Sequence, residues 1–465
     1  MPKKIPVALK NFYRNLKGRI DLMLFFFRWD RDYRKDLTTT LLTFALFIYS
    51  IMTWDSYWDY LALFIEACIM AVHMGGEMSI MPLDYRPSHG GVVYSARLAT
   101  HIAYDEESYE MADVLPMAAE QALGFANPIR GMGLSRESPL VSDKVDDSLM
   151  LLEKLPYFEV GGEVNFLVSR HQLRYIALRV LNKKTHTTNG QLLALFDHAE
   201  CLMGHRPMTV RKTSYFNGLL TMEAFRSRIF RGNLQNAPEV YTDLTTYFPV
   251  IKFKESDRNV LQFTPDFYHH VSTHIGITSL VLTENNRVAM LRQGAANAIG
   301  GNMICLGGSG SFDYGDLRKA SYPDDFRDAI KYALAREVCE ETGVGMRAVD
   351  EVRRNTMVTG FFRWVDRCGK PEFVGLTRAG NLPFFGQRDV DDDEITGFDE
   401  VPVTINRPED FIDVLAYLRE KKVVVALSSI MALHRMTVIA GYNHSGATET
   451  QKKIYDKVAA FIKGA

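Results

Sequence analysis

One nine-residue segment, residues 336–344, constrains the fold and chemistry of this chain more than any other. It reads Arg-Glu-Val-Cys-Glu-Glu-Thr-Gly-Val and carries three glutamates, Glu337, Glu340 and Glu341. Residues three and four positions apart share one face of a helix, so these carboxylates can converge. Carboxylates held so close repel one another unless a cation neutralises them, and oxygen-rich sites suit Mg²⁺ or Mn²⁺. The segment therefore indicates metal-dependent chemistry on a ligand that contains phosphate groups.

The residues before this segment predict the helix that carries it, from residue 325 to residue 342. Apolar side chains recur there at helical spacing and define one face: Ala329, Ile330, Ala333, Leu334 and Val338. Gly343 follows directly, and glycine is the residue that most often ends an α-helix. Cys339 is expected to be a packing residue, because no histidine partner stands near it in the sequence.

The order of residues 336–344 resembles the later half of the Nudix box, R-E-apolar-x-E-E-x-G-apolar, and matches it at every specified position. The surrounding sequence is similar to Nudix domains as well. Residues 276–283 (GITSLVLT) and 287–292 (RVAMLR) resemble the opening hairpin, and residues 373–377 (FVGLT) resemble a later strand. The resemblance covers residues 270–440 and implies an α/β/α sandwich.

This resemblance implies a role for each of the four charged residues in the segment 336–344. Glu340 and Glu341 would hold Mg²⁺ or Mn²⁺, and Glu337 would add a ligand or act as a general base on water. Arg336 would orient the carboxylates through charge-assisted hydrogen bonds, so Glu337 and Arg336 are the expected catalytic residues. Glu394 lies near the place where the family often has a further acidic ligand.

Two glycines before the helix belong to the expected site. Residues 304–308 read Ile-Cys-Leu-Gly-Gly, which is similar to the apolar-Pro-Gly-Gly stretch before the box, although Leu306 replaces the usual proline. Gly307 and Gly308 would let the backbone approach the phosphate groups of a nucleotide, because glycine has no side chain to obstruct that approach.

The first half of the box departs from the family pattern. Asp328 stands at the position of the family's early glutamate, and Tyr322 stands at the position of its glycine. The resemblance implies that Asp328 pairs with Arg336, over a shorter reach than glutamate has. The loop of residues 309–323 is also unusually long. The sequence alone therefore leaves open whether the site hydrolyses its ligand or only binds it.

The N-terminal part of the chain predicts a membrane module. Residues 1–36 contain ten lysines and arginines against four aspartates, and their apolar residues recur as in a basic amphipathic helix on a membrane surface. Residues 37–80 contain no lysine or arginine and hold two apolar stretches, 37–54 and 60–74, which predict a transmembrane helical hairpin. The preceding positive charge places both ends of that hairpin in the cytoplasm.

A Nudix domain behind such a hairpin resembles the transmembrane Nudix effectors of bacterial CBASS anti-phage systems. That resemblance implies a homo-oligomer of the bacterial inner membrane whose cytoplasmic Nudix domain binds a nucleotide messenger, such as a cyclic oligonucleotide, and which disrupts the lipid bilayer. Glu66 would then lie inside the oligomer. The alternative is a Nudix hydrolase that cleaves a nucleoside diphosphate linked to another moiety. A third, lesser option is a soluble fold into which the hairpin packs.

The predicted fold class is α+β, with four parts behind the basic N-terminal segment. The hairpin is followed by a middle α+β region over residues 84–265 without an assigned role, by the Nudix-like sandwich, and by a C-terminal helix over residues 441–465. Residues 106–123 and 192–203 of the middle region predict helices. The net charge of −2 gives no support to the binding of nucleic acid polymers.

Overall fold

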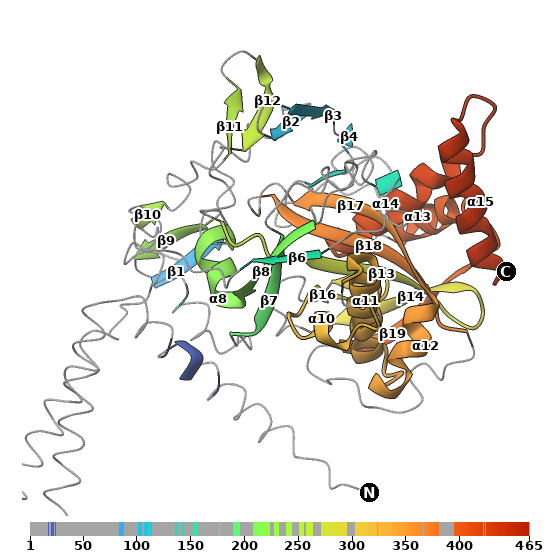
Figure 1. Cartoon of the computed structure of the whole chain (residues 1–465), viewed down its shortest axis with the longest axis horizontal. Helices are drawn as coiled ribbons and strands as arrows, with labels where there is room; N and C mark the ends of the chain where they lie inside the picture. Colours follow the sequence, from blue (N-terminus) through green and yellow to red (C-terminus); the bar gives the residue numbers. More distant parts are fainter. Residues whose placement is uncertain are drawn as a thin grey trace, which may run out of the picture.

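The computed structural model shows a mixed α/β fold (Figure 1). Most of the residues that the structure describes lie in the C-terminal half of the chain. They are residues 271–294, 303–322, 324–364, 367, 369–380, 395–421, 423 and 425–464. Before residue 271 the structure describes residues 189–195 and 208–223, several further strands and a few single residues or pairs.

The largest sheet has nine strands in the order β15-β14-β13-β18-β17-β5-β4, with β16 paired to β13 and β19 paired to β14. The strands are β4 (Ala112–Asp113), β5 (Ser135–Glu137), β13 (Gly276–Leu282), β14 (Arg287–Gln293), β15 (Ile304–Cys305), β16 (Ser309–Ser311), β17 (Thr356–Trp364), β18 (Lys370–Arg378) and β19 (Ile395–Thr404). Strands β13 and β18 run parallel, whereas β17 and β18 run antiparallel, so the sheet is mixed.

The predicted opening hairpin is confirmed as β13 and β14, which pair antiparallel. Their turn closes through hydrogen bonds from Thr283 N to Arg287 O and from Asn286 N to Thr283 O, both 2.9 Å long. Asn286 has φ of 53°, in the left-handed region that asparagine visits more readily than most residues. The strand predicted over residues 373–377 is likewise confirmed, as the centre of β18.

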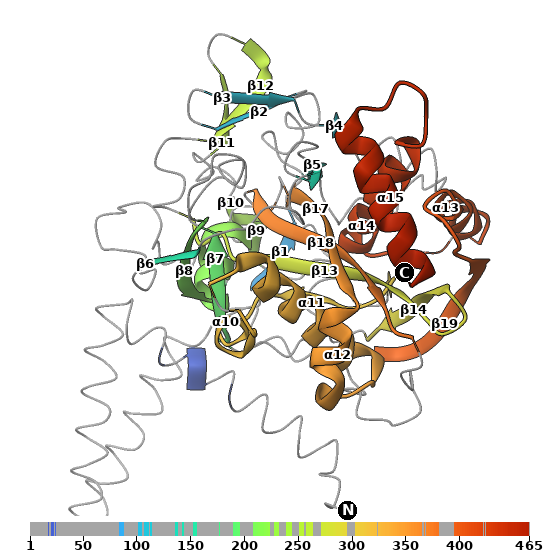
Figure 2. The ribbon, with the colours of Figure 1, turned by 45° about the vertical axis from the view of Figure 1, so that its right-hand side comes forward.

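Helices cover both faces of this sheet (Figure 2). The helices of the C-terminal half are α10 (Asp316–Lys319), α11 (Phe326–Thr342), α12 (Val349–Arg354), α13 (Asp410–Glu420), α14 (Leu427–Gly441) and α15 (Glu449–Lys463). Along β13, Ile277 and Val281 belong to the apolar core beneath α11, whereas Leu280 and Leu282 belong to the core beneath α14. Because successive strand residues point to opposite faces, the strand supports both cores and the result is a three-layer α/β/α arrangement.

The middle region is described mainly as strands. Its elements are β1 (Leu83–Pro87), β2 (His101–Tyr104), β3 (Glu107–Glu110), β6 (Leu152–Leu155), β7 (Gln191–Leu195), β8 (Met208–Ser214), α8 (Tyr215–Gly218), the π-helical turn η3 (Leu219–Glu223), β9 (Ser227–Arg231), β10 (Glu239–Asp243), β11 (Ile251–Lys254) and β12 (Asp257–Phe263). The helices predicted over residues 106–123 and 192–203 are therefore wrong where those residues are described. Residues 192–195 form a fully buried strand, and short apolar runs do not distinguish such a strand from a buried helix.

Strand β7 joins the middle region to the C-terminal half. Leu193 N donates to Phe312 O over 2.9 Å, and Leu193 O accepts from Ile275 N over 2.9 Å. Leu193, Leu195 and Val210 belong to the same apolar core as α11. The sheet β6-β8-β7 and helix α11 therefore share one core.

A second attachment involves residues 142–143. Ser142 Oγ accepts a hydrogen bond of 2.9 Å from Phe361 N in β17. Asp143 Oδ1 accepts from Arg435 Nη2 at 2.6 Å and from Tyr442 Oη at 2.8 Å. The Arg435 side chain is fully buried, so Asp143 compensates a charge that would otherwise stand in the core.

The predicted fold class must be corrected at the N-terminus. No helix in the described part of the chain is both long enough and apolar enough to cross a membrane, so the transmembrane hairpin is not supported. Residues 37–80, on which it was predicted, lie outside the described residues, as do most of residues 1–36. The prediction rested on apolar stretches near the lower length limit of a span, one of them interrupted by Glu66.

Candidate functional site

The glutamates of the candidate site stand on α11, whose ends follow from the sequence. Asp325 Oδ1 accepts hydrogen bonds from Arg327 N (2.9 Å) and Asp328 N (3.3 Å) at the first turn. Gly343 ends the helix with φ of 72°. The predicted helix is thus confirmed. Cys339 is buried in the core as predicted, and burial raises the pKa of its thiol to about 12.

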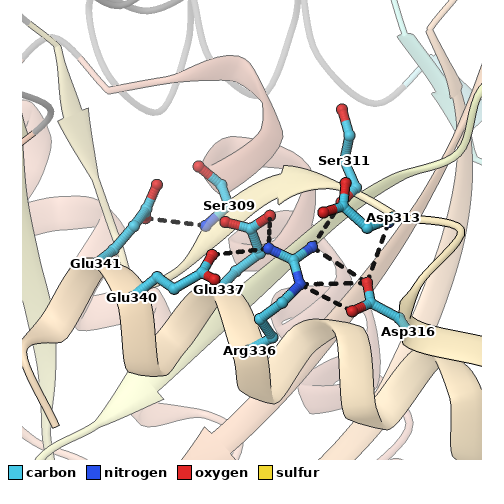
Figure 3. Close-up of polar contacts among 8 residues, drawn as sticks. All are labelled: Ser309, Ser311, Asp313, Asp316, Arg336, Glu337, Glu340 and Glu341. Atoms are coloured by element: carbon cyan, nitrogen blue, oxygen red, sulfur yellow. Dashed lines mark hydrogen bonds and ion pairs between the residues drawn. The ribbon is translucent and has the colours of Figure 1, made fainter. Parts of the chain in front are cut away.

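Arg336 lies at the centre of the site (Figure 3). Its Nη1 atom is 2.9 Å from Glu337 Oε1 and 2.7 Å from Glu340 Oε2, and its Nε atom is 3.0 Å from Asp316 Oδ1. Its Nη2 atom donates to Ser311 O over 2.8 Å. Burial of the guanidinium by itself would lower its pKa, but the negative charges of Glu337 and Asp316 raise it by more. The pKa of Arg336 therefore lies well above its ordinary value. A permanently charged arginine therefore holds carboxylates from two segments together.

Glu337 is the carboxylate most affected by its surroundings. Its side chain is only 12% exposed. Burial raises the pKa of Glu337 to about 7 against the opposing effect of Arg336, and the negative charges of Glu340 and Asp313 add to the increase. A methyl group on residue 310 would overlap the Glu337 carboxylate, so Gly310 leaves the space in which it lies. The positive charge of Arg336 is therefore not enough to offset burial and the neighbouring carboxylates, and the surroundings of Glu337 favour its protonated form.

Glu341 and the two predicted glycines lie where the loop before α11 meets the helix. Glu341 Oε2 accepts a hydrogen bond of 3.0 Å from Ser309 N. A side chain at Gly308 would overlap the backbone of α11, and a side chain at Gly307, where φ is 140°, would overlap the backbone of β13. Close packing of the loop accounts for both glycines. Their approach to the phosphate groups of a ligand stays a prediction.

The predicted pairing of Asp328 with Arg336 is wrong. Asp328 forms an ion pair with Arg353 of α12, and its Oδ2 atom accepts from Tyr322 N over 3.1 Å. Asp328 lies in the first turn of α11, and eight residues of helix rise by about 12 Å, which carries Arg336 away from a short aspartate. The carboxylate that Arg336 meets comes from Asp316 instead.

Sequence reasoning missed two acids of the site, Asp313 and Asp316. Both belong to the long loop of residues 309–323, and Asp316 begins helix α10 there. Asp313 N donates to Asp316 Oδ2 over 3.0 Å. Burial raises the pKa of each carboxyl, and Arg336 opposes that change. The signal available in the sequence was a turn-forming run, Asp-Tyr-Gly-Asp, inside an insertion directly before the acidic helix.

The donor chemistry of the site fits a hard divalent cation. Glu337, Glu340 and Glu341 present carboxylate oxygens at one end of α11, and Mg²⁺ and Mn²⁺ prefer such ligands. Within the described ranges, however, no three acidic, histidine or cysteine side chains already form a metal-binding group. Arg336 supplies the positive charge between Glu337 and Glu340, so the carboxylates must turn away from it to meet a cation. Glu394, the fourth predicted ligand, lies outside the described residues.

Comparisons with known proteins do not add a family assignment to this geometry. No protein-family model matches the chain, and a search of curated proteins finds no match either. The resemblance to Nudix domains rests on residues 336–344 and on the sequence around them.

Proposed function

We propose that residues 270–440 form a Nudix-like domain that hydrolyses a nucleoside diphosphate linked to another moiety, with a divalent cation held on α11. The observation that carries the proposal is the convergence of Glu337 and Glu340 on Arg336 Nη1, at 2.9 Å and 2.7 Å. Glu341 stands one residue further along the same helix end. A bound Mg²⁺ or Mn²⁺ would neutralise the diphosphate and favour deprotonation of an attacking water.

The site's own residues would divide the remaining tasks. Glu337 would accept the proton of the attacking water, since burial raises its pKa to about 7, close to the pH at which a general base works best. Glu340 would be open to the incoming ligand, because 46% of its side chain is exposed. Arg336 orients both carboxylates and, at 8% exposure, stays shielded from water.

The proposal is tested by turnover of a panel of nucleoside diphosphate derivatives with Mg²⁺, with Mn²⁺ and with EDTA. Glu340→Gln and Glu341→Gln should each lower kcat by about 100-fold, a typical loss for a group that assists proton transfer or charge neutralisation. Glu351→Gln is the matched control, because Glu351 is an exposed glutamate on α12. Cleavage that persists in EDTA, or in both α11 variants, contradicts the proposed mechanism.

Binding of a nucleotide without hydrolysis is the second candidate function. One observation favours it: Asp328 pairs with Arg353 and not with Arg336, so the first half of the box does not serve the helix as the family resemblance implies. A cyclic oligonucleotide belongs in the panel for this reason. Mass analysis of the nucleotide recovered from the protein separates the two functions. An intact bound nucleotide indicates a receptor, and a cleaved nucleotide indicates a hydrolase.

A further inference from the structure

Asp316 and Arg336 form a buried pair with a fixed orientation. Arg336 Nε lies 3.0 Å from Asp316 Oδ1 and 3.2 Å from Oδ2, and Nη2 lies 3.2 Å from Oδ2. The side chains are 2% and 8% exposed. Two adjacent guanidinium nitrogens facing one carboxylate define the plane of the arginine as well as its position.

The plane of the Arg336 guanidinium determines which of its nitrogen atoms faces Glu337 and Glu340. With Nε and Nη2 directed at Asp316, and Nη2 also donating to Ser311 O at 2.8 Å, Nη1 is the nitrogen that reaches Glu337 and Glu340 (Figure 3). We propose that Asp316 is the positioning residue of the site: it fixes the Arg336 guanidinium, which holds Glu337 and Glu340 together at the end of α11 until they turn from it to a divalent cation. This inference rests on the proposed function.

The middle region holds Asp316 in place through the loop that carries it. Tyr314 N donates to Gln191 O in β7 over 3.0 Å, and Phe312 O accepts from Leu193 N over 2.9 Å. Lys212 of β8 places its Nζ atom 5.0 Å from the centre of the Tyr314 ring. The inference therefore gives strands β7 and β8 a role in the site: they secure the loop whose aspartate orients Arg336.

The first readout tests the pair itself. Urea unfolding is measured for Asp316→Asn, Arg336→Gln and the double variant, and for the same cycle built with Asp328→Asn. Asp328 is a suitable control because it is also a largely buried aspartate paired with an arginine, but at the other end of α11. The Asp316 cycle should depart from additivity by about tenfold in the unfolding equilibrium constant, and the Asp328 cycle should be additive within about twofold.

The second readout tests whether that pair serves a cation. Mn²⁺ titration followed by electron paramagnetic resonance of the free ion gives the dissociation constant without any turnover. Asp316→Asn should weaken Mn²⁺ binding by about 10-fold to 100-fold, the range for residues that orient metal ligands, and Asp316→Glu should recover part of the loss. Asp328→Asn should stay within about twofold of the unsubstituted protein even where it lowers stability.

Each possible result of these two experiments either supports or overturns the role of Asp316. Additivity in the Asp316 cycle overturns the inference, and so does an Asp316→Asn variant that is coupled to Arg336 but binds Mn²⁺ as tightly as the unsubstituted chain. In that second case the proposed function survives and only the role of Asp316 is lost. An unsubstituted protein that binds no Mn²⁺ overturns the proposed function and the inference together.

Discussion

The Glu337 carboxylate occupies the space that a side chain on Gly310 would fill. A side chain larger than glycine at this position would therefore require the Glu337 carboxylate to move. The relationship links the sheet directly to the most strongly perturbed carboxyl of the site, and it leads to the first prediction.

Gly310→Ala should displace Glu337 and lower the free energy of unfolding by about 1–3 kcal/mol, the usual cost of forcing an extra carbon into a packed site. Mn²⁺ affinity should fall in the same variant. Gly315→Ala is the matched control, because no atom lies within 4 Å of the added carbon there. Equal unfolding midpoints for the two alanine variants in urea would show that Glu337 does not depend on Gly310.

The second prediction concerns pH in the presence of EDTA. Burial raises the pKa of Glu337 to about 7, above its value in the unfolded chain, so the folded state favours the protonated form. Its stabilising contribution is therefore complete below about pH 4.5 and is lost as the pH rises through 7, by on the order of 3 kcal/mol. The difference in unfolding free energy between the unsubstituted chain and Glu337→Gln isolates this group. A difference that does not change between pH 5 and pH 8 would contradict it.

The third prediction concerns the attachment of residues 142–143. Asp143→Ala removes the carboxylate that faces the fully buried Arg435, so we expect a loss of about 3–5 kcal/mol in the free energy of unfolding. Lys453→Ala breaks an ion pair whose two side chains are largely exposed, and it should leave the free energy of unfolding nearly unchanged. Similar losses for the two variants would mean that Asp143 does not compensate Arg435.

The fourth prediction concerns the start of α11. Asp325→Ala removes the side chain that accepts hydrogen bonds from Arg327 N and Asp328 N, and it should cost about 1 kcal/mol. Asp325→Ser keeps an acceptor and should recover most of that stability. Mn²⁺ affinity should remain unchanged in both variants, because the glutamates lie at the opposite end of the helix. A loss of affinity in Asp325→Ala would show that the cap also supports the site.

The elements with strong local signals were predictable from the sequence. Helix α11 has a capping aspartate, an apolar face and a terminal glycine, and the hairpin β13–β14 has two apolar runs around a short polar turn. The middle region was less predictable, because the apolar run of β7 depends on pairing with segments far away in the chain. The predicted membrane hairpin came from hydropathy and from the distribution of charged residues, neither of which carries information on packing partners.

The sequence predicted which face of α11 carries the candidate site, but not which residues from other segments meet that face. The spacing of Glu337, Glu340 and Glu341 requires no knowledge of the fold. The partner of Arg336 depends on how a long insertion folds back, so Asp316 could not be chosen over Asp328 by counting residues. Likewise, Gly310 looks like an ordinary loop glycine until the position of Glu337 is known.

The most direct test of the central claim is anomalous X-ray diffraction from crystals of the full chain grown with Mn²⁺. We predict one strong anomalous peak at the C-terminal end of α11, with carboxylate oxygens of Glu340 and Glu341 at about 2.2 Å from the ion. The same peak should disappear in a Glu340→Gln, Glu341→Gln double variant. Absence of a peak at this helix end in the unsubstituted protein, at saturating Mn²⁺, would contradict the assignment of the site as a metal centre.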